Sequence, residues 1–272
     1  LAQCFGFGCR IMLRSITTKE KAMNKFALIG NDIAHSLSPA LFEAAGGHTD
    51  GSTYGLIDTL NLGKALEIFY TEGYKGANIT APFKEEILSY CTHCDPAVQS
   101  TGAANLIVRT ESGIKAYNTD CFGVAGPIEQ RGVLPCNVLV AGAGGAAKAA
   151  VYILKKKGFN ITIVNREKSK GRELSQRTGT DFMEEGELRN AFHRFGLLVY
   201  TIPVLSPVFS GIPLDSVIIL EANYKKPVLN SVISKEYISG IEWLVHQAIP
   251  GFRIFTNREP DVKAMFRLAH DS

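Results

Sequence analysis

A glycine-rich stretch in the middle of the chain, residues 137–150, has the residue types and spacing of a dinucleotide-binding turn. Residues 138–140 predict a buried strand, and residues 146–154 predict a helix directly after the turn. In the G-x-G-x-x-A pattern between them, Gly142 allows the turn and Gly144 lets the backbone approach a pyrophosphate. The positive end of the following helix would face the same anion, so the stretch predicts a cofactor site. The residues expected to bind the cofactor here are Gly142, Ala143, Gly144, Gly145 and Ala146.

The next predicted strand, residues 159–164, ends in residues that bear on which dinucleotide is bound. An NAD site usually carries an acid near this position, which accepts a hydrogen bond from the ribose 2′-OH. Here the strand is followed by Asn165 and Arg166, and a guanidinium suits a 2′-phosphate. Glu167 is the only acid nearby and argues against this interpretation. We therefore predict NADP, bound by Asn165 and Arg166; the alternative is a glycine-rich turn of another α/β protein beside a solvated arginine.

Two hydroxyl groups in the N-terminal part of the chain, those of Ser36 and Ser38, could bind a carboxylate. The pair Ser38-Pro39 predicts a helix start, with Ser38 as the N-cap and Pro39 in the first helical position. The hydroxyls would then lie at the positive end of a helix, which favours an anion. The alternative is that Ser38 only caps the helix and Ser36 only belongs to a turn.

Lys84 and Asp120 are candidates for proton transfer. Lys84 follows Pro82 in an expected first helical turn, where the helix dipole disfavours a cation. If its side chain is also partly buried, the lysine becomes a candidate proton donor. Asp120 follows a predicted strand and precedes a helix, where an aspartate is usually a cap. Taken alone, each residue also has an ordinary structural explanation, as a surface lysine and a helix cap.

The elements that position these residues alternate between strand and helix. Strands are predicted at 25–29, 54–57, 77–80, 106–108, 114–117, 138–140, 159–164, 181–183, 197–201 and 217–220. Helices are predicted at 39–45, 62–70, 82–88, 122–131, 146–154 and 242–248, with further helices after residue 166, up to residue 195 and from residue 260. Alternating units with short connections imply a parallel sheet, and the predicted fold class is α/β.

The composition is that of an ordinary globular protein. A chain of 272 residues allows one large or two modest domains, and the formal charge of +3 is too small to argue for nucleic acid or membrane binding. Six scattered cysteines predict free thiols in a reducing, cytoplasmic compartment: Cys4, Cys9, Cys91, Cys94, Cys121 and Cys136. Cys91 and Cys94 form a C-x-x-C pair without a second pair, so we expect no metal site.

Residues 1–22 differ in character from the rest of the chain. Their basic residues follow a short apolar core, which does not fit a secretory signal. We interpret them as an extension, with Met23 as the natural start; a transit peptide is the alternative.

Several blocks of this sequence, in order and at matching spacing, resemble those of the shikimate dehydrogenase family. They are residues 29–39, 76–84, 102–105, 117–120, 142–146, 165–166 and 240–248, so the resemblance runs from about Met23 to the end. It implies a two-domain α/β fold. A shikimate-binding substrate domain at 23–121 would be completed by the C-terminal helices at 242–272, and a Rossmann NADP-binding domain would lie at 122–241.

The resemblance also implies roles for individual residues. Lys84 and Asp120 match the family's catalytic pair, and Ser36 and Ser38 match the hydroxyls that hold the substrate carboxylate. The other matching substrate-binding positions are Asn78, Thr80, Asn105, Tyr224 and Gln247. The implied activity is the reversible, NADPH-dependent reduction of 3-dehydroshikimate to shikimate, in chorismate and aromatic amino acid biosynthesis. We expect a cytoplasmic monomer or homodimer that binds this small molecule and neither nucleic acid nor membrane.

The chain also departs from the family pattern, mostly in the cofactor half. Leu106 and Glu167 each stand where the family usually has threonine, and residues 200–206 lack the glycine of the nicotinamide-side loop. Residues 221–224 replace an Asp-x-Tyr-Tyr-like block. Two alternatives therefore stay open: an NAD-dependent quinate/shikimate dehydrogenase, and a catalytically weak paralogue that binds the ligand as a sensor.

Overall fold

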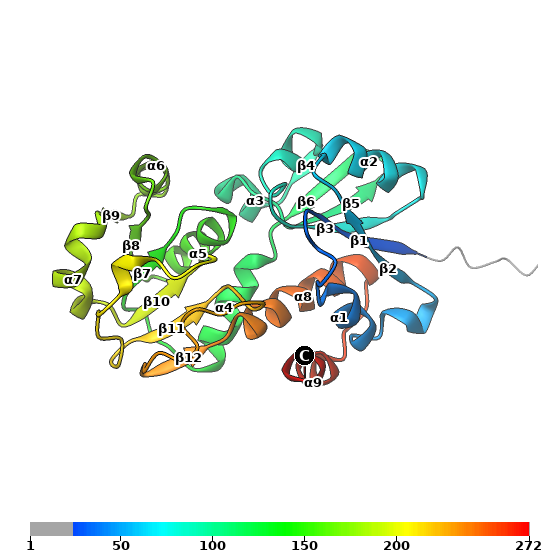
Figure 1. Ribbon diagram of the computed structural model, residues 1–272. Coiled ribbons are helices and arrows are strands. Elements are labelled where there is room, and N and C mark those ends of the chain that lie inside the picture. Colours follow the sequence, from blue (N-terminus) through cyan, green and yellow to red (C-terminus); the bar gives the residue numbers. More distant parts are fainter. Residues whose placement is uncertain (1–23, 272) are drawn as a thin grey trace, which may run out of the picture.

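The computed structural model describes residues 24–271, in two halves that stand side by side (Figure 1). The expected extension at 1–22, with Cys4 and Cys9, lies outside the described residues. Each half is built around one six-stranded sheet, and two helices pass between the halves (Figure 1). No helix within residues 24–271 is both long and apolar enough to span a membrane.

The N-terminal half contains a mixed sheet in the order β2-β1-β3-β5-β6-β4. Its strands are β1 (Lys25–Gly30), β2 (Thr53–Asp58), β3 (Gly76–Ile79), β4 (His93–Cys94), β5 (Leu106–Thr110) and β6 (Gly113–Tyr117). β1, β2 and β3 are parallel, β5 is antiparallel to both of its neighbours, β3 and β6, and β4 is parallel to β6. Because side chains alternate along β1, Ala27 and Ile29 pack toward α2 (Leu62–Thr71), and Phe26 packs toward the C-terminal helices.

The second half contains a fully parallel sheet in the order β12-β11-β10-β7-β8-β9. Its strands are β7 (Asn137–Ala141), β8 (Asn160–Val164), β9 (Asp181–Met183), β10 (Leu197–Tyr200), β11 (Ile218–Glu221) and β12 (Glu236–Ile238). The crossover helices are α5 (Gly145–Lys156), α6 (Lys168–Thr178) and α7 (Leu188–Ala191). The chain winds outward from β7 in one direction and from β10 in the other, so the carboxyl ends of these neighbours form a crevice where such folds bind ligands. The predicted parallel sheet and α/β class are confirmed.

Two helices, α4 (Asp120–Gln130) and α8 (Gly240–Thr256), cross between the halves (Figure 1). A Cβ on Gly123 of α4 would lie 2.8 Å from the backbone oxygen of Trp243 in α8, closer than real Cβ contacts. Beyond the crossing, the guanidinium of Arg131 donates two hydrogen bonds, of 2.8 and 3.0 Å, to the Glu242 carboxylate. The same Cβ would clash with the ring of Trp243, so the crossing depends on glycine on one helix and a large side chain on the other.

The remaining helices complete the first half. They are α1 (Ser38–Ala44), α3 (Pro96–Thr101) and α9 (Val262–His270). Apolar residues of α1, α8 and α9 form one cluster with Phe26, on the face of the sheet opposite α2.

The prediction of an α-helix at 82–88 is wrong. Residues 81–85 form turns, and a 3-10 helix follows at Glu86–Tyr90. The carbonyl of Lys84 accepts a hydrogen bond from Ala104 N at 2.8 Å, while Leu88 N donates to the carbonyl of Glu85. A tertiary contact thus takes the acceptor that an α-helix would use, and the helix-dipole argument for Lys84 no longer holds.

The predicted helix at 242–248 is too short. Helix α8 continues through Pro250 to Thr256, although a proline removes one hydrogen bond from the helix interior. Phe252 is buried, and the ring of Phe255 stacks on Phe26 at 4.7 Å between centroids. This packing favours continuation of the helix. The three-residue strand β12, at the edge of its sheet, was also not predicted.

Gly123→Ala should lower the free energy of unfolding by about 1–2 kcal/mol, because overpacking at the helix crossing outweighs the better helix propensity of alanine. Urea denaturation measures this quantity. Gly186→Ala is the matched control, since a Cβ there meets nothing within 4 Å; we expect a change within about 0.5 kcal/mol. Equal stability of both variants would contradict the close crossing of α4 and α8.

Candidate active site

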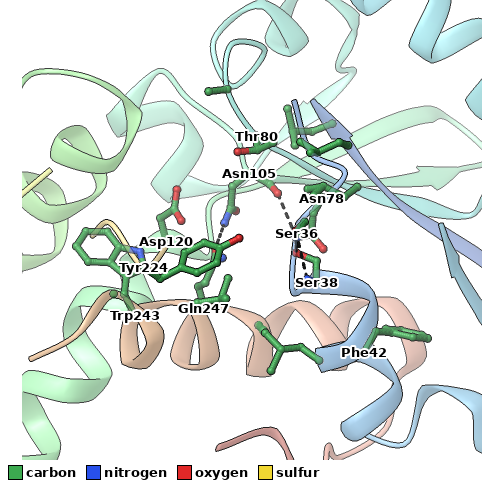
Figure 2. Close-up of a pocket in the computed structure, with 18 of the residues that line it drawn as sticks. Ser36, Ser38, Phe42, Asn78, Thr80, Asn105, Asp120, Tyr224, Trp243 and Gln247 are labelled. Carbon is green, nitrogen blue, oxygen red and sulfur yellow. Dashed lines mark hydrogen bonds between the residues drawn. The ribbon is translucent and has the colours of Figure 1, made fainter. Parts of the chain in front are cut away.

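A cavity of about 290 Å³ lies where the two halves meet (Figure 2). It is bordered by the loop after β1, the end of β3, the starts of α4 and α5, the loop after β11, and α8. The structure brings all the predicted catalytic and substrate-binding residues to this one cavity: Ser36, Ser38, Asn78, Thr80, Lys84, Asn105, Asp120, Tyr224 and Gln247. Their individual contacts with a ligand stay predictions.

Lys84 and Asp120 form an ion pair in the cavity, with 2.5 Å between Lys84 Nζ and Asp120 Oδ2. The lysine side chain is 22% exposed and the aspartate side chain 5%. Asp120 is the first residue of α4 and caps nothing, so its interpretation as a cap is wrong. A carboxylate at this helix end is favourable, and the pair leaves the ammonium with further N–H groups that can donate into the cavity.

The glycine turn lies directly beside this ion pair. A Cβ on Gly145, the first residue of α5, would lie 3.3 Å from Cδ of Lys84. The next residue, Ala146, borders the same cavity as Lys84. A ligand held by the turn can therefore reach the ion pair.

Ser36, Ser38 and Tyr224 bring three hydroxyl groups together at another part of the cavity (Figure 2). The Ser36 hydroxyl donates to Ser38 Oγ at 3.1 Å and accepts from Ser38 N at 3.2 Å. Burial raises the pKa of Tyr224, and the nearby Ser36 hydroxyl and Leu37 backbone partly oppose the shift. The tyrosine thus stays a neutral hydroxyl that can donate to an anion.

The prediction that Ser38 is the N-cap of α1 is wrong. The N-cap is Leu37, without a side-chain hydrogen bond, and Ser38 is the first helical residue. The Ser38 side chain accepts no backbone hydrogen bond at the start of α1, and the Ser36 hydroxyl accepts from Ser38 N instead. The Ser38 hydroxyl therefore has no capping role that would account for its place at the cavity.

A hydrogen-bonded row of polar side chains forms a further wall of the cavity. The Tyr54 hydroxyl donates to Asn78 Oδ1 at 2.7 Å, and Asn78 Nδ2 donates to the carbonyl of Asn105 at 3.2 Å. Asn105 Nδ2 in turn donates to Gln247 Oε1 at 2.7 Å. The row ties β2, β3 and α8 together and presents amide groups to a ligand with several hydroxyls.

Tyr54 and Trp243 border the cavity but were not among the predicted site residues (Figure 2 labels Trp243). Burial raises the pKa of Tyr54, with the Ser38 hydroxyl acting in the opposite direction, so its hydroxyl is neutral. No local sequence signal could identify Tyr54 as a site residue. It comes near Asn78 only because β2 and β3 both pair with β1, one on each side.

A second cavity, of about 530 Å³, lies along the glycine turn. Gly144 borders it, and a Cβ on Gly144 would meet nothing within 4 Å, so the backbone there is open to a ligand. Gly142 has φ +117°, which favours glycine, and Thr201 occupies the space that a Cβ would need. No side chain caps the N-terminal end of α5. These features fit the pyrophosphate of a dinucleotide.

The far end of this second cavity is bordered by Asn165 and Arg166. Arg166 has no ion-pair partner among residues 24–271, so its guanidinium is available to a phosphate. Glu167 pairs instead with Lys170 at 2.8 Å, and this contact raises the pKa of Lys170. The acid that argues against NADP is thus neutralised by a neighbouring cation, and the residues present fit NADP.

The cysteines within residues 24–271 show no metal-binding arrangement. In the described part of the chain, no three histidine, cysteine or acidic side chains come together as metal ligands. Cys91 and Cys94 are free, and burial raises the pKa of both thiols, that of Cys91 to about 11. They are therefore protonated thiols near neutral pH.

Known proteins resemble this chain along most of its length. A family model described as the shikimate dehydrogenase substrate binding domain matches residues 28–107. A protein of Actinobacillus pleuropneumoniae named shikimate dehydrogenase (NADP(+)) is 32% identical over 269 residues, which cover 90% of this chain and 96% of the relative. The structure of shikimate 5-dehydrogenase from Thermus thermophilus, in complex with NADP(H) and shikimate, has a TM-score of 0.80 at 26% identity and covers 92% of this chain and 99% of its own.

A quinate dehydrogenase from Corynebacterium glutamicum, in complex with NAD, also has a TM-score of 0.80, with the same coverage of 92% and 99%. At 23% identity this likeness shows only a shared fold. The relative at 32% identity extends over nearly the whole chain, and both the α/β fold and the resemblance stated from the sequence are confirmed. The chain belongs to the shikimate dehydrogenase family.

Proposed function

We propose that this protein is an NADPH-dependent shikimate dehydrogenase, which reversibly reduces 3-dehydroshikimate to shikimate in chorismate and aromatic amino acid biosynthesis. The observation that carries the proposal is the Lys84–Asp120 ion pair, which lies between the glycine turn and a cavity bordered by hydroxyl and amide groups. This arrangement supports a reaction between a bound dinucleotide and a bound polyhydroxylated acid.

The cofactor would occupy the cavity along the glycine turn. Gly142, Gly144 and Gly145, with Ala143 and Ala146, would hold its pyrophosphate by their backbone, and Asn165 and Arg166 would hold the 2′-phosphate. When bound, NADPH supplies the hydride that reduces a ketone. The nearness of Gly145 to Lys84 supports a reaction at the boundary of the two cavities.

The substrate would occupy the cavity between the halves. The hydroxyls of Ser36, Ser38 and Tyr224 suit a carboxylate, because each can donate a hydrogen bond to it. The ring hydroxyls would meet the polar side chains of the opposite wall. Amides and a hydroxyl there can both donate and accept, and the carboxylate of Asp120 can accept: Asn78, Thr80, Asn105, Asp120 and Gln247.

Lys84 is the proposed proton donor. As a ketone is reduced, negative charge develops on its oxygen, and an ammonium beside that oxygen can stabilise it and transfer a proton. Asp120 accepts a hydrogen bond from Lys84 Nζ and so fixes the direction of the ammonium. In the reverse reaction the neutral amine of Lys84 would take the proton from the alcohol.

The division of the chain and its setting are part of the same proposal. The substrate domain would comprise 23–121 and 242–272, and the cofactor domain 122–241. The start of α4 at Asp120 and of α8 at Gly240 supports these boundaries. We also propose a cytoplasmic protein, monomeric or homodimeric, whose partner is this small molecule and neither nucleic acid nor membrane.

A steady-state assay that crosses shikimate and quinate with NADP and NAD tests this function. We expect turnover of shikimate with NADP to exceed the other combinations.

Arg166→Ala should weaken NADP binding by about 1–3 kcal/mol, as for a lost charge-assisted hydrogen bond, and leave NAD binding nearly unchanged. The control is Arg172→Ala, which removes an exposed arginine of α6 that pairs with Glu184 outside this cavity.

The assay also separates the alternatives. Preferred turnover of quinate with NAD would indicate a quinate/shikimate dehydrogenase. Binding of shikimate without turnover would indicate the sensor. Equal losses of NADP and NAD binding in Arg166→Ala would mean that Arg166 does not contact the 2′-phosphate.

Lys84→Ala should lower kcat by roughly 10²–10⁴-fold, the range for loss of a general acid or base, while shikimate binding weakens far less. Asp120→Asn should cause a similar loss, and the double variant should be little worse than either alone, because residues that act as a unit are not additive. Lys157→Ala is the control, since it removes a lysine that pairs with Glu129 away from both cavities. Near-full turnover of Lys84→Ala would refute the proposed pair.

Ser36→Ala and Ser38→Ala should each raise KM for shikimate while kcat changes little, because both hydroxyls are proposed to hold the carboxylate. Since Ser38 does not cap α1, its replacement should change the free energy of unfolding by less than about 0.5 kcal/mol. Asn61→Ala is the contrasting variant: Asn61 accepts from Lys64 N as the N-cap of α2, so we expect a loss of about 1 kcal/mol in stability and an unchanged KM. An unchanged KM in Ser38→Ala would remove Ser38 from the site.

A further inference from the structure

The last residue of β10, Tyr200, is buried beneath the loop that follows its strand. Its side chain is fully buried, and its ring packs edge-on against Phe209, with 5.3 Å between centroids. Its hydroxyl donates to the carbonyl of Val204 at 2.8 Å and accepts from Ser206 N at 2.8 Å. One side chain thus bonds the loop backbone at two points, four and six residues further along the chain.

Only the neutral phenol can make both hydrogen bonds at once. Burial raises the pKa of Tyr200, the Ser206 N–H opposes the shift, and the nearby Glu221 carboxylate adds to it. A neutral phenol is at once a donor and an acceptor, whereas a phenolate could not donate to the Val204 carbonyl.

The loop held in this way is one wall of the cofactor cavity. Its residues 202–207 all border the cavity that also contains Gly144 and Arg166. The loop is fixed at two further points: Thr201 Oγ1 donates to the Ala141 carbonyl at 2.7 Å, and Asn223 Nδ2 donates to the Pro203 carbonyl at 3.3 Å. At the tip of this wall, the apolar side chain of Val204 is 61% exposed.

We propose that Tyr200 is a positioning residue for the cofactor: its hydroxyl holds residues 201–206 in the shape that borders the dinucleotide before the dinucleotide binds. This role rests on the proposed function, since it concerns NADP. Ordering a loop opposes binding, and a loop that is already ordered avoids this cost. Without the hydroxyl, Ser206 N and the Val204 carbonyl lose their partner and the loop adopts other conformations. The apparent Kd then rises in inverse proportion to the fraction of molecules with the loop in place.

Tyr200→Phe tests the role, because it removes only the hydroxyl and keeps the ring against Phe209. Isothermal titration calorimetry should show a Kd for NADP about 5- to 30-fold higher than in the wild-type protein, the size expected for two lost hydrogen bonds. KM for NADPH should rise in parallel. The kcat at saturating NADPH and KM for shikimate should stay within about twofold, since a preorganising contact outside the reacting groups affects cofactor binding alone.

Hydrogen exchange of the Phe209 amide reports on the shape of the loop, because Phe209 N donates to the Ser206 carbonyl at 3.0 Å and this acceptor remains in Tyr200→Phe. In the free wild-type protein this amide should exchange slowly, and NADP should slow it little further. In free Tyr200→Phe it should exchange faster, and NADP should restore protection. Fast exchange of the Phe209 amide in the free wild-type protein would overturn the proposal without any variant.

Tyr237→Phe is the matched control. The Tyr237 hydroxyl donates to Glu221 Oε2 at 2.8 Å in the same half, but Tyr237 does not border the cofactor cavity. It should lower the melting temperature about as much as Tyr200→Phe and leave the Kd for NADP unchanged. An equal rise of the Kd in both variants would mean that general stability, and not Tyr200, controls binding.

The remaining outcomes separate this role from the proposed function. If the wild-type protein binds NADP and Tyr200→Phe binds it equally well, the role of Tyr200 is refuted and the enzyme proposal stands. If the wild-type protein binds neither NADP nor NAD, the proposed cofactor is refuted, and the role of Tyr200 falls with it.

Discussion

The ion pair between Lys84 and Asp120 is the contact on which the arrangement of the site depends. A carboxylate as buried as that of Asp120 is costly without a partner, so the pair links the turn after β3 firmly to the start of α4. The same turn is bonded to the segment just before β5 through the Lys84 carbonyl and Ala104 N. Lys84 is therefore held through both its ammonium and its backbone carbonyl, at the place where the cofactor half begins.

Helix α4 connects the Lys84–Asp120 ion pair to the packing between the two halves. Its first residue is Asp120, its glycines lie against α8, and its last turn leads to Arg131, which pairs with Glu242 of α8. Because α8 carries Gln247, which accepts a hydrogen bond from Asn105, the crossing also fixes the wall of the substrate cavity. The two halves thus meet through one closely packed helix pair, and a change in the crossing would move the glycine turn relative to Lys84.

The parts of the fold that the sequence predicts are those that local chemistry determines. The buried runs of β7 and β8, the glycine turn and the start of α5 follow from periodicity and from glycine, and the structure contains them. The errors have long-range causes. Segment 82–88 is not an α-helix because Ala104 N takes the carbonyl of Lys84. Helix α8 continues past Pro250 because Phe255 stacks on Phe26 and Phe252 packs against Phe42. Tyr54 reaches the site only through strand pairing. The predicted site residues do lie together, but this followed from matching whole blocks to a family, since Lys84 and Asp120 are 36 positions apart and each has an ordinary local explanation.

The departures from the family pattern in the cofactor half bear on whether the site is ordered. Tyr200 and Glu221 end neighbouring strands and are paired in register, and each bonds the loop after its own strand. The fully buried Glu221 carboxylate accepts from Val228 N at 2.7 Å, from Leu229 N at 3.1 Å and from the Tyr237 hydroxyl at 2.8 Å. A buried carboxylate with three donors is satisfied, so it stabilises the loop that carries Tyr224 toward the substrate cavity. Here the unusual residues supply internal hydrogen bonds to the two loops that border the cofactor and the substrate, so both cavities keep fixed walls despite the departures from the family pattern.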